Sequence, residues 1–405
     1  MSSAFLDLGI TGVVAGGDGM ARDDDGRVVF VTGALPGERV RASITESKRG
    51  FARAALVEVL EPAAGRVLPP CPHVADGCGG CTWQHVDIGA QQELKAAIVA
   101  DALRHTGKLE PPPIDLGPVL DPFGHRTTVR AAVVDGRAGF RHRRSHDVVG
   151  VDRCLVAHPL IDELIEHGRF GSAVEATLRA GAATGERLAL LEPGVDEHVE
   201  LPADVQVVGP RDRAAIHEVV AGRRWRISAR SFFQTRPDGA EALVDVVRRA
   251  IADRLTPTTT LVDLFAGVGL FAGALGGGAG DARAVVAVEG SAAAARDARH
   301  NLRDIGATVL HVDVNRWRPT PADVVVADPS RAGLGRRAVE RIAGTGADRV
   351  VLVSCDPAAQ ARDAGLLALA GYRLTGVTLV DLFPHTPHVE AVCRFDRDPT
   401  GPSAP

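Results

Sequence analysis

The chain has 405 residues, a formal net charge of -5, 45% hydrophobic residues and 24% charged residues. A single core stops growing at roughly 250 to 300 residues, so this length predicts two or three domains. No apolar run approaches the ~18 residues of a membrane span and no secretory signal opens the chain, which predicts a cytoplasmic protein. In that reducing compartment the six cysteines favour metal binding or catalysis over disulfides. The net negative charge requires any nucleic-acid-binding surface to be local.

Residues 1–62 predict a small β-barrel. Short apolar runs at 28–31, 40–44 and 55–60 alternate with turns rich in glycine and aspartate, and strands at this spacing are typical of such barrels. A basic loop at 48–53 contains one aromatic residue. It is a weak nucleic-acid signal, and a solvated hairpin explains it more simply.

Three thiols stand close together in the next segment: Cys71, Cys78 and Cys81, in the sequence CPHVADGCGGC. Glycines between them let the backbone turn around a central object, so a metal centre explains the group better than packing does. Cys154 is the obvious fourth ligand, and four thiolates suit either zinc or an iron–sulfur cluster. The spacing does not choose between these two, although it disfavours a radical-type cluster motif, whose first gap is usually shorter.

Residues 63–228 predict a central α+β domain with a local basic surface. After a helix-like segment at 91–104, the stretch 121–145 carries six arginines against two aspartates. Such a patch can neutralise phosphates, and the interleaved Phe140 can stack on an unpaired base. An exposed strand face explains the same residues equally well. The arginines are Arg126, Arg130, Arg137, Arg141, Arg143 and Arg144.

Residues 229–405 predict a doubly wound, Rossmann-like parallel sheet, because apolar strands alternate with helices rich in Ala, Leu and Arg. The expected strands are 261–265, 284–289, 309–313, 324–328 and 350–353, and a final hairpin would add 374–382 and 389–395. Gly267 and Gly269 follow the first strand and allow close backbone approach to a ligand at a helix N-terminus. Glu289 ends the second strand, where it can bind a ribose, and Asp313 ends the third, as a weaker candidate for the adenine end.

The glycines alone also fit a dinucleotide-binding fingerprint, so a nicotinamide-dependent reductase is an alternative. Two acids favour adenosylmethionine instead. Asp263 stands at the strand end before the glycines, and Asp328 follows the fourth strand, beside the strand that ends at Cys355. A methyl acceptor would lie at this place.

Cys355 is placed where active residues of parallel sheets lie, beyond the carboxyl end of a buried strand. A small packing cysteine is the alternative explanation. A thiolate that adds to carbon 6 of uracil turns the ring into an enolate that can attack a methylsulfonium at carbon 5. A base must then remove the proton from carbon 5, and Glu390 is the best candidate, since the last hairpin would return it to the site.

With these residues in view, the sequence resembles the class I RNA 5-methyluridine methyltransferase family over essentially its whole length. The matching motifs are CPHVADGCGGC, GFRHRRSHDVV, SFFQ, DLFAGVG, VVAVEG, DPSRAG, VSCDP and LFPHTPHVEAV, after a TRAM-like N-terminal barrel. The resemblance implies that Cys355 is the nucleophile and Glu390 the base. It implies contacts to adenosylmethionine from Gln234, Phe265, Glu289 and Asp328. It also implies a [4Fe-4S] cluster on Cys71, Cys78, Cys81 and Cys154, which would support folding and RNA binding more than methyl transfer.

Several residues depart from the family pattern. The first cluster gap is one residue longer than usual, Leu270 replaces a frequent polar residue, and Asp356 replaces the usual Asn after the cysteine. Cys393 is most simply a packing residue. The TRAM-like domain together with the cluster favours 23S ribosomal RNA as substrate over transfer RNA, and a monomer is expected. An RNA-binding or chaperone module without activity is a further alternative, against which the pair Cys355 and Glu390 argues.

Overall fold

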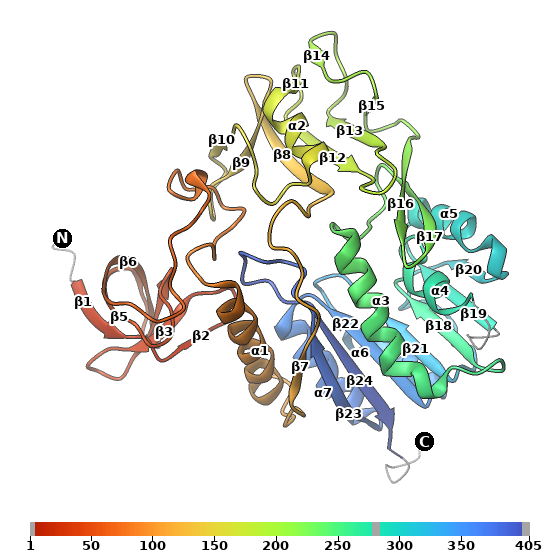
Figure 1. The fold of residues 1–405 in the computed structure, drawn as a ribbon. Helices are drawn as coiled ribbons and strands as arrows, with labels where there is room; N and C mark the ends of the chain where they lie inside the picture. The colour runs from red at the N-terminus through yellow and green to blue at the C-terminus, as the bar shows by residue number, and fades with distance from the viewer. Residues whose placement is uncertain (1–4, 278–283, 399–405) are drawn as a thin grey trace.

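The computed structural model describes residues 5–277 and 284–398, which form several sheets with helices packed on them (Figure 1). The predicted multi-sheet α/β class is thereby confirmed. Within the described ranges, no helix is both long and apolar enough to cross a membrane.

The N-terminal unit is a six-stranded sheet with the strand order β1-β5-β6-β4-β3-β2. Its long strands alternate buried and exposed side chains at their starts, and the inward positions form one apolar core that includes Val29, Val40 and Ala52. The strands are β1 (Phe5–Gly9), β2 (Gly12–Val13), β3 (Gly19–Arg22), β4 (Val28–Thr32), β5 (Arg39–Ser47) and β6 (Phe51–Glu61).

The central region is built around a second six-stranded sheet, ordered β10-β9-β8-β12-β13-β15, with α2 packed on it. Two small two-stranded sheets, β11-β14 and β16-β17, complete this region. The elements are η1 (Pro72–Val74), α1 (Ile88–His105), β7 (Ile114–Leu116), β8 (Thr128–Val134), β9 (Arg137–Arg141), β10 (Val148–Gly150), α2 (Pro159–His167), β11 (Arg169–Phe170), β12 (Glu175–Ala180), β13 (Arg187–Glu192), β14 (Val199–Glu200), β15 (Val205–Val208), β16 (Ala215–Val220) and β17 (Arg223–Ser228).

The C-terminal region contains an eight-stranded sheet with the order β20-β19-β18-β21-β22-β24-β23-β7. The strands from β20 to β22 are parallel, and β24 is antiparallel to both neighbours. The elements are α3 (Pro237–Ile251), η2 (Ala252–Arg254), β18 (Thr260–Leu264), α4 (Leu270–Leu275), β19 (Ala284–Glu289), α5 (Ala292–Asn301), η3 (Arg303–Ile305), β20 (Thr308–His311), β21 (Val324–Ala327), α6 (Gly335–Gly344), β22 (Arg349–Ser354), α7 (Pro357–Leu369), β23 (Tyr372–Leu379) and β24 (Ala391–Arg397).

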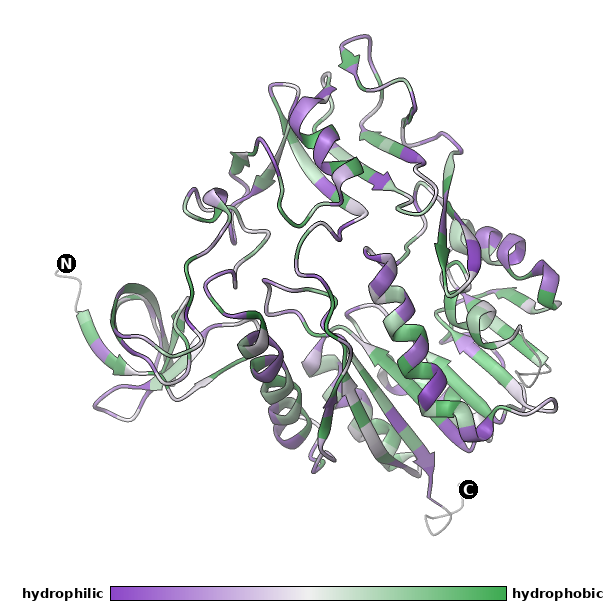
Figure 2. Cartoon of the chain, viewed as in Figure 1, coloured by the Kyte–Doolittle hydropathy of each residue, from purple (hydrophilic) through white to green (hydrophobic). Residues whose placement is uncertain are grey.

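Both faces of the large sheet are covered, which explains why its central strands are apolar throughout. All residues of β21 and β22 are buried, and two separate apolar cores lie on the two faces, one with α3 and α4 and the other with α1, α6 and α7. Figure 2 shows the result, since these strands are mainly hydrophobic while α3 carries both kinds of residue. A strand with two buried faces cannot alternate polar and apolar residues.

One segment of the predicted central region crosses over to the large sheet. Strand β7 pairs in parallel with β23 at the sheet edge, and α1 packs against α7. Residues 88–116 therefore help to build the layer that supports the C-terminal sheet, although they precede the central sheet in sequence.

Candidate active site and thiol pocket

The turn after β18 is shaped by three residues in the left-handed backbone region: Phe265 (φ 60°), Gly267 (φ 58°) and Gly269 (φ 96°). Gly269 is the N-cap of α4. The buried Asp263 secures the turn, because its Oδ2 accepts a hydrogen bond of 2.8 Å from the backbone N–H of Ala272. Its other oxygen, Oδ1, is buried without a hydrogen-bond partner. A Cβ placed on Gly267 would meet no atom within 4 Å, so this turn borders open space that a ligand can fill.

Glu289 lies beside this turn at the end of β19. Its Oε2 accepts a hydrogen bond of 2.8 Å from Gly267 N–H, and its Oε1 accepts one of 2.6 Å from Ser291 N–H. Asp313 is exposed in the loop after β20, and its backbone passes beside Gly290. The structure therefore brings together the glycine turn and both predicted acids at the carboxyl ends of the first three parallel strands.

Cys355 and Glu390 face each other at the ends of two paired strands. Ser354 of β22 pairs with Ala391 of β24 in antiparallel register, so Cys355 follows the last pair on one strand and Glu390 precedes it on the other. Glu390 is buried, and its Oε1 has no hydrogen-bond partner. Cys355 is only partly buried, which leaves its thiol accessible to a ligand.

Several acids gather at this end of the sheet, and burial raises the pKa of each. Burial raises the pKa of Asp328 to about 7. Burial, followed by the charges of Asp328 and Glu289, raises the pKa of Asp263 to about 8. Burial and then Asp328 raise the pKa of Glu390 well above its ordinary value. Desolvated carboxyl groups in mutual repulsion are relieved by a bound cation, and adenosylmethionine carries positive charge on its sulfonium and ammonium groups.

The thiol of Cys355 has a raised pKa of about 11, caused first by burial and then by the negative charges of Glu390 and Asp328. Arg331 opposes these effects, since its guanidinium favours the thiolate. The sequence analysis assigned no role to Arg331. Arg331 stands three residues after Asp328, in the turn that follows β21. This position in the sequence could have identified it as a site residue.

Gln234 lies in the segment before α3. Its side chain is buried, and the neighbouring Thr235 accepts a backbone hydrogen bond of 2.8 Å from Thr127. Helix α3 packs on β22 and β24 and then leads into the start of β18. Its N-terminus therefore lies at the carboxyl edge of the sheet, the same edge as Cys355.

The loop that carries Glu390 is tied to α1 by buried polar contacts. Lys95 Nζ donates to Asp381 Oδ1 at 2.6 Å and to the Phe383 carbonyl at 2.9 Å. His385 N–H donates to Gln91 Oε1 at 2.6 Å, and its carbonyl accepts a hydrogen bond of 2.8 Å from Trp83 N–H. Trp83 is two residues from Cys81, so the thiol segment and the Glu390 loop are directly connected.

The four predicted metal ligands surround one cavity of about 320 Å³. Arg126 and Arg141 line it as well, and the isolated bridge between Cys78 and His142 brings the thiol segment against the predicted basic stretch. Within the described ranges, however, no three His, Cys, Asp or Glu side chains are arranged to hold a metal ion. The donor set of four thiols around one space fits a metal centre in chemistry, while the side chains of this structure do not show its coordination geometry. The thiols are Cys71, Cys78, Cys81 and Cys154.

Comparison with known proteins places this chain in a family. Residues 6–57 match the TRAM domain. The chain is 38% identical to an RNA methyltransferase of Streptomyces avermitilis described as uncharacterized, over 95% of this chain and 96% of that protein. It is 35% identical to the 23S rRNA (uracil(1939)-C(5))-methyltransferase RlmD of Alkalilimnicola ehrlichii, over 97% of both chains. The chain belongs to the RNA 5-methyluridine methyltransferase family.

A solved structure supports the fold of this methyltransferase over nearly its full length. The tRNA (uracil-54, C5)-methyltransferase of Pyrococcus abyssi, in complex with S-adenosyl-L-homocysteine, superposes with a TM-score of 0.74 at 24% identity and covers 96% of this chain and 100% of its own. The predicted enzyme class, an adenosylmethionine-dependent RNA (uracil-C5) methyltransferase, is confirmed. The nicotinamide interpretation of the glycine turn is therefore set aside.

Several arginines of the predicted basic stretch of the methyltransferase form hydrogen bonds or ion pairs with other residues of the protein. Arg143 and Arg144 both donate to the buried Asp18 of the TRAM domain, at 3.0 and 3.2 Å. Arg130 is paired with Glu175, and Arg137 donates to the carbonyl of Glu166. Arg126 and Arg141 face the thiol pocket. Several of these arginines therefore hold domains and strands together.

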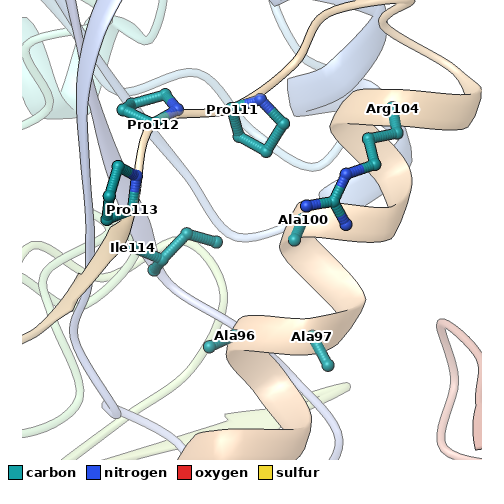
Figure 3. Close-up of a pocket in the computed structure, with 8 residues that line it drawn as sticks. All are labelled: Ala96, Ala97, Ala100, Arg104, Pro111, Pro112, Pro113 and Ile114. Atoms are coloured by element: carbon teal, nitrogen blue, oxygen red, sulfur yellow. The ribbon is translucent and has the colours of Figure 1, made fainter.

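A further cavity of the methyltransferase lies away from the site. Figure 3 shows it between α1 and the segment Pro111–Ile114, with Ala96, Ala97 and Ala100 on the helix side. None of the predicted site residues lines this cavity, whose walls are mainly apolar.

Proposed function

We propose that this methyltransferase forms 5-methyluridine in 23S ribosomal RNA, with Cys355 as nucleophile and Glu390 as base. The observation that carries the proposal is the meeting of these two residues across β22 and β24, beside Asp328 and Arg331. Relatives named for uracil 1939 of 23S rRNA support the choice of RNA. Transfer RNA is the alternative substrate, since the solved structure of similar fold has that printed activity.

The proposed mechanism uses the chemistry of a thiolate and a carboxylate that act on one base. The Cys355 thiolate adds to carbon 6 of the uracil, after the target base has left its stack to reach the strand end. Arg331 favours the thiolate electrostatically. Adenosylmethionine, when bound, supplies the methyl group to carbon 5. Glu390 then removes the proton from carbon 5, and the bond from Sγ to carbon 6 breaks as the double bond re-forms. The raised pKa of Glu390 suits a group that must accept a proton.

We propose that the carboxyl edge of the sheet holds adenosylmethionine. Support comes from the open space at the glycine turn and the unpartnered Asp263 Oδ1. The acid of Glu289, already aligned by two backbone N–H groups, retains lone pairs for ribose hydroxyl groups. The residues assigned to this role are Gln234, Phe265, Gly267, Gly269, Glu289, Asp313 and Asp328.

We further propose that Cys71, Cys78, Cys81 and Cys154 hold a [4Fe-4S] cluster, with zinc as the alternative. The shared cavity of the four thiols supports this assignment. When bound, the cluster would stabilise the segment that contacts the Glu390 loop through Trp83. It has no assigned role in methyl transfer.

The proposed domain organisation is a TRAM-like barrel at 1–62, a central domain at 63–228 and a Rossmann-like methyltransferase domain at 229–405. Residues 88–116 would be a shared segment, since they join the C-terminal layer. The protein is proposed to be a monomer.

The test compares ribosomal and transfer RNA from cells with and without the gene by mass-spectrometric nucleoside mapping. We expect 5-methyluridine to disappear from 23S rRNA and to return when the RNA is treated with purified protein and labelled adenosylmethionine. The Cys355→Ala protein should not restore it, whereas Cys393→Ala, a control that removes a buried thiol of β24, should do so. Loss confined to transfer RNA would select the alternative substrate. Unchanged 5-methyluridine in both pools would overturn the proposal.

A further inference from the structure

A third cavity, of about 490 Å³, opens between the β16-β17 hairpin and the C-terminal end of α5. It shares no lining residue with the proposed catalytic or thiol sites. Its lining is mainly polar and rich in cationic and titratable groups. These are Arg223, Arg224, Arg226, Arg303, His217, His300 and the acidic Asp304.

Two of the arginines are held in place by the protein while keeping donors free. Arg226 is paired with the fully buried Asp297, and its backbone N–H donates to Asn301 Oδ1 at 2.9 Å. Arg223 Nη2 donates to the Asn301 carbonyl at 2.9 Å and to Asp304 at 2.8 Å. Within the described ranges, the Nε and second terminal nitrogen of each guanidinium make no hydrogen bond, so both can bind a further acceptor.

The cavity carries a surplus of positive charge. Glu186 pairs with Arg224, Asp297 with Arg226, and Asp304 with Arg223. These three carboxylates face four arginines, and the fourth, Arg303, is exposed and has no ion pair among residues 5–277 and 284–398. Burial and then the charges of Arg303 and Arg226 lower the pKa of His300, which agrees with a positive potential there.

The cavity is connected to the methyl-transfer site by two routes. Asn301 Nδ2 donates at 3.0 Å to the carbonyl of Val268, inside the glycine turn. Strand β17 starts in the cavity at Arg223 and leads to Ser228, after which the chain continues to Gln234. A strand of six residues spans roughly 20 Å. Through Asn301 the wall of the cavity is therefore joined directly to the glycine turn of the proposed adenosylmethionine site.

We propose that this cavity binds backbone phosphates of an RNA arm next to the target uridine. This inference rests on the proposed function, in which the substrate is a structured RNA. Guanidinium groups donate in a fork that matches phosphate oxygens, and a preformed group of them binds a polyanion without reading its sequence.

The test uses Arg303→Glu with two RNA probes: a long 23S rRNA fragment that includes the helices around the target loop, and a short hairpin with the loop alone. We expect the variant to bind the long fragment about tenfold more weakly at low salt, with the slope of log Kd against log salt reduced by about 1. Binding and methylation of the short hairpin should not change. Arg303→Lys should retain wild-type affinity because it keeps the charge.

Arg373→Glu is the matched control, since Arg373 is also exposed but lies on β23, near the opposite edge of the sheet. Circular dichroism would verify that every variant folds. Wild-type affinity and salt slope of Arg303→Glu on the long fragment would overturn the inference, as would an equal loss on both probes or the same loss in Arg373→Glu. If the wild-type protein methylates neither probe, the proposed function fails, while the binding comparison still decides the role of the cavity.

Discussion

Cys355 and Glu390 are 35 positions apart in the chain, yet they flank the same register pair, Ser354 with Ala391. The antiparallel insertion of β24 beside β22 produces this arrangement. A parallel last strand would have placed Glu390 at the opposite edge of the sheet. The final hairpin is therefore what brings the proposed nucleophile and the proposed base together.

Replacing these two residues should interrupt the reaction at different stages. Cys355→Ala should abolish methylation and leave RNA affinity within about twofold of wild type, because no bond to carbon 6 can form. In the Glu390→Gln variant, Cys355 should still form its bond to carbon 6 of the uracil. The uracil should then stay attached, because no carboxylate removes the proton from carbon 5. A denaturing gel with labelled RNA would reveal the covalent complex in the second variant alone. A stable complex with Cys355→Ala would contradict the assignment.

The raised pKa of Cys355, about 11, predicts how the free enzyme reacts with iodoacetamide. The thiolate fraction, and with it the alkylation rate, should rise about tenfold per pH unit from neutral pH toward that pKa. Arg331→Ala should slow alkylation at a given pH, because the lost cation raises the pKa of Cys355 further. Peptide mapping by mass spectrometry would separate this thiol from the other five. Arg373→Ala should have no effect, and an unchanged rate in Arg331→Ala would show that the guanidinium does not act on the thiol.

Alanine substitutions at the two glycines of the turn should lower the stability of the protein by different amounts. At Gly269 the backbone has φ 96° and a Cβ would lie 2.9 Å from Leu302 Cδ1, so Gly269→Ala should cost about 2 kcal/mol of stability. At Gly267 the φ is 58° and the space is open, so Gly267→Ala should cost about 1 kcal/mol. Its main effect should be weaker binding of adenosylmethionine. Urea unfolding and calorimetric titration would measure the two effects, and equal unfolding midpoints would refute the packing argument.

The buried pair of Lys95 and Asp381 should stabilise the loop that carries Glu390. Lys95→Met leaves a buried carboxylate without its partner and should cost about 3 to 5 kcal/mol. Lys95→Met with Asp381→Leu should recover part of this loss, because no charge is then buried alone. Thermal unfolding of the single and double variants provides the comparison. Additive losses in the double variant would mean that the two side chains do not act as a pair.

Metal content should depend on the thiol pocket. Protein purified without oxygen should contain about four irons per chain with the absorption of a [4Fe-4S] cluster, and Cys81→Ser should lose most of them. Cys393→Ser is the control, since Cys393 is buried in β24 away from that cavity. Zinc in place of iron would select the alternative metal. A metal-free wild-type protein that still methylates RNA would remove the proposed role of the four thiols.

The sequence alone predicted the strands of the C-terminal sheet from β18 onward and the residues that follow several of them. The expected strands 284–289 and 350–353 correspond to β19 and β22, and the helix expected at 91–104 lies within α1. These predictions succeed because strands buried on both faces, and the turns that end them, are marked by local composition. Local patterns predicted only a small β-barrel at 1–62; its TRAM-like character was implied by the family resemblance, and the match of residues 6–57 to the TRAM domain confirms it.

Only the tertiary structure decided which distant residues meet. Local sequence did not indicate that β7 and α1 join the C-terminal layer, or that Asp18 pairs with Arg143 and Arg144. Local sequence also did not indicate the raised pKa values of Asp263 and Asp328, because the burial that raises them depends on the packing of separate segments. Strand patterns are set by neighbours in the chain. Charge pairing and desolvation depend on neighbours in space, which are established only when the sheets and helices have packed together.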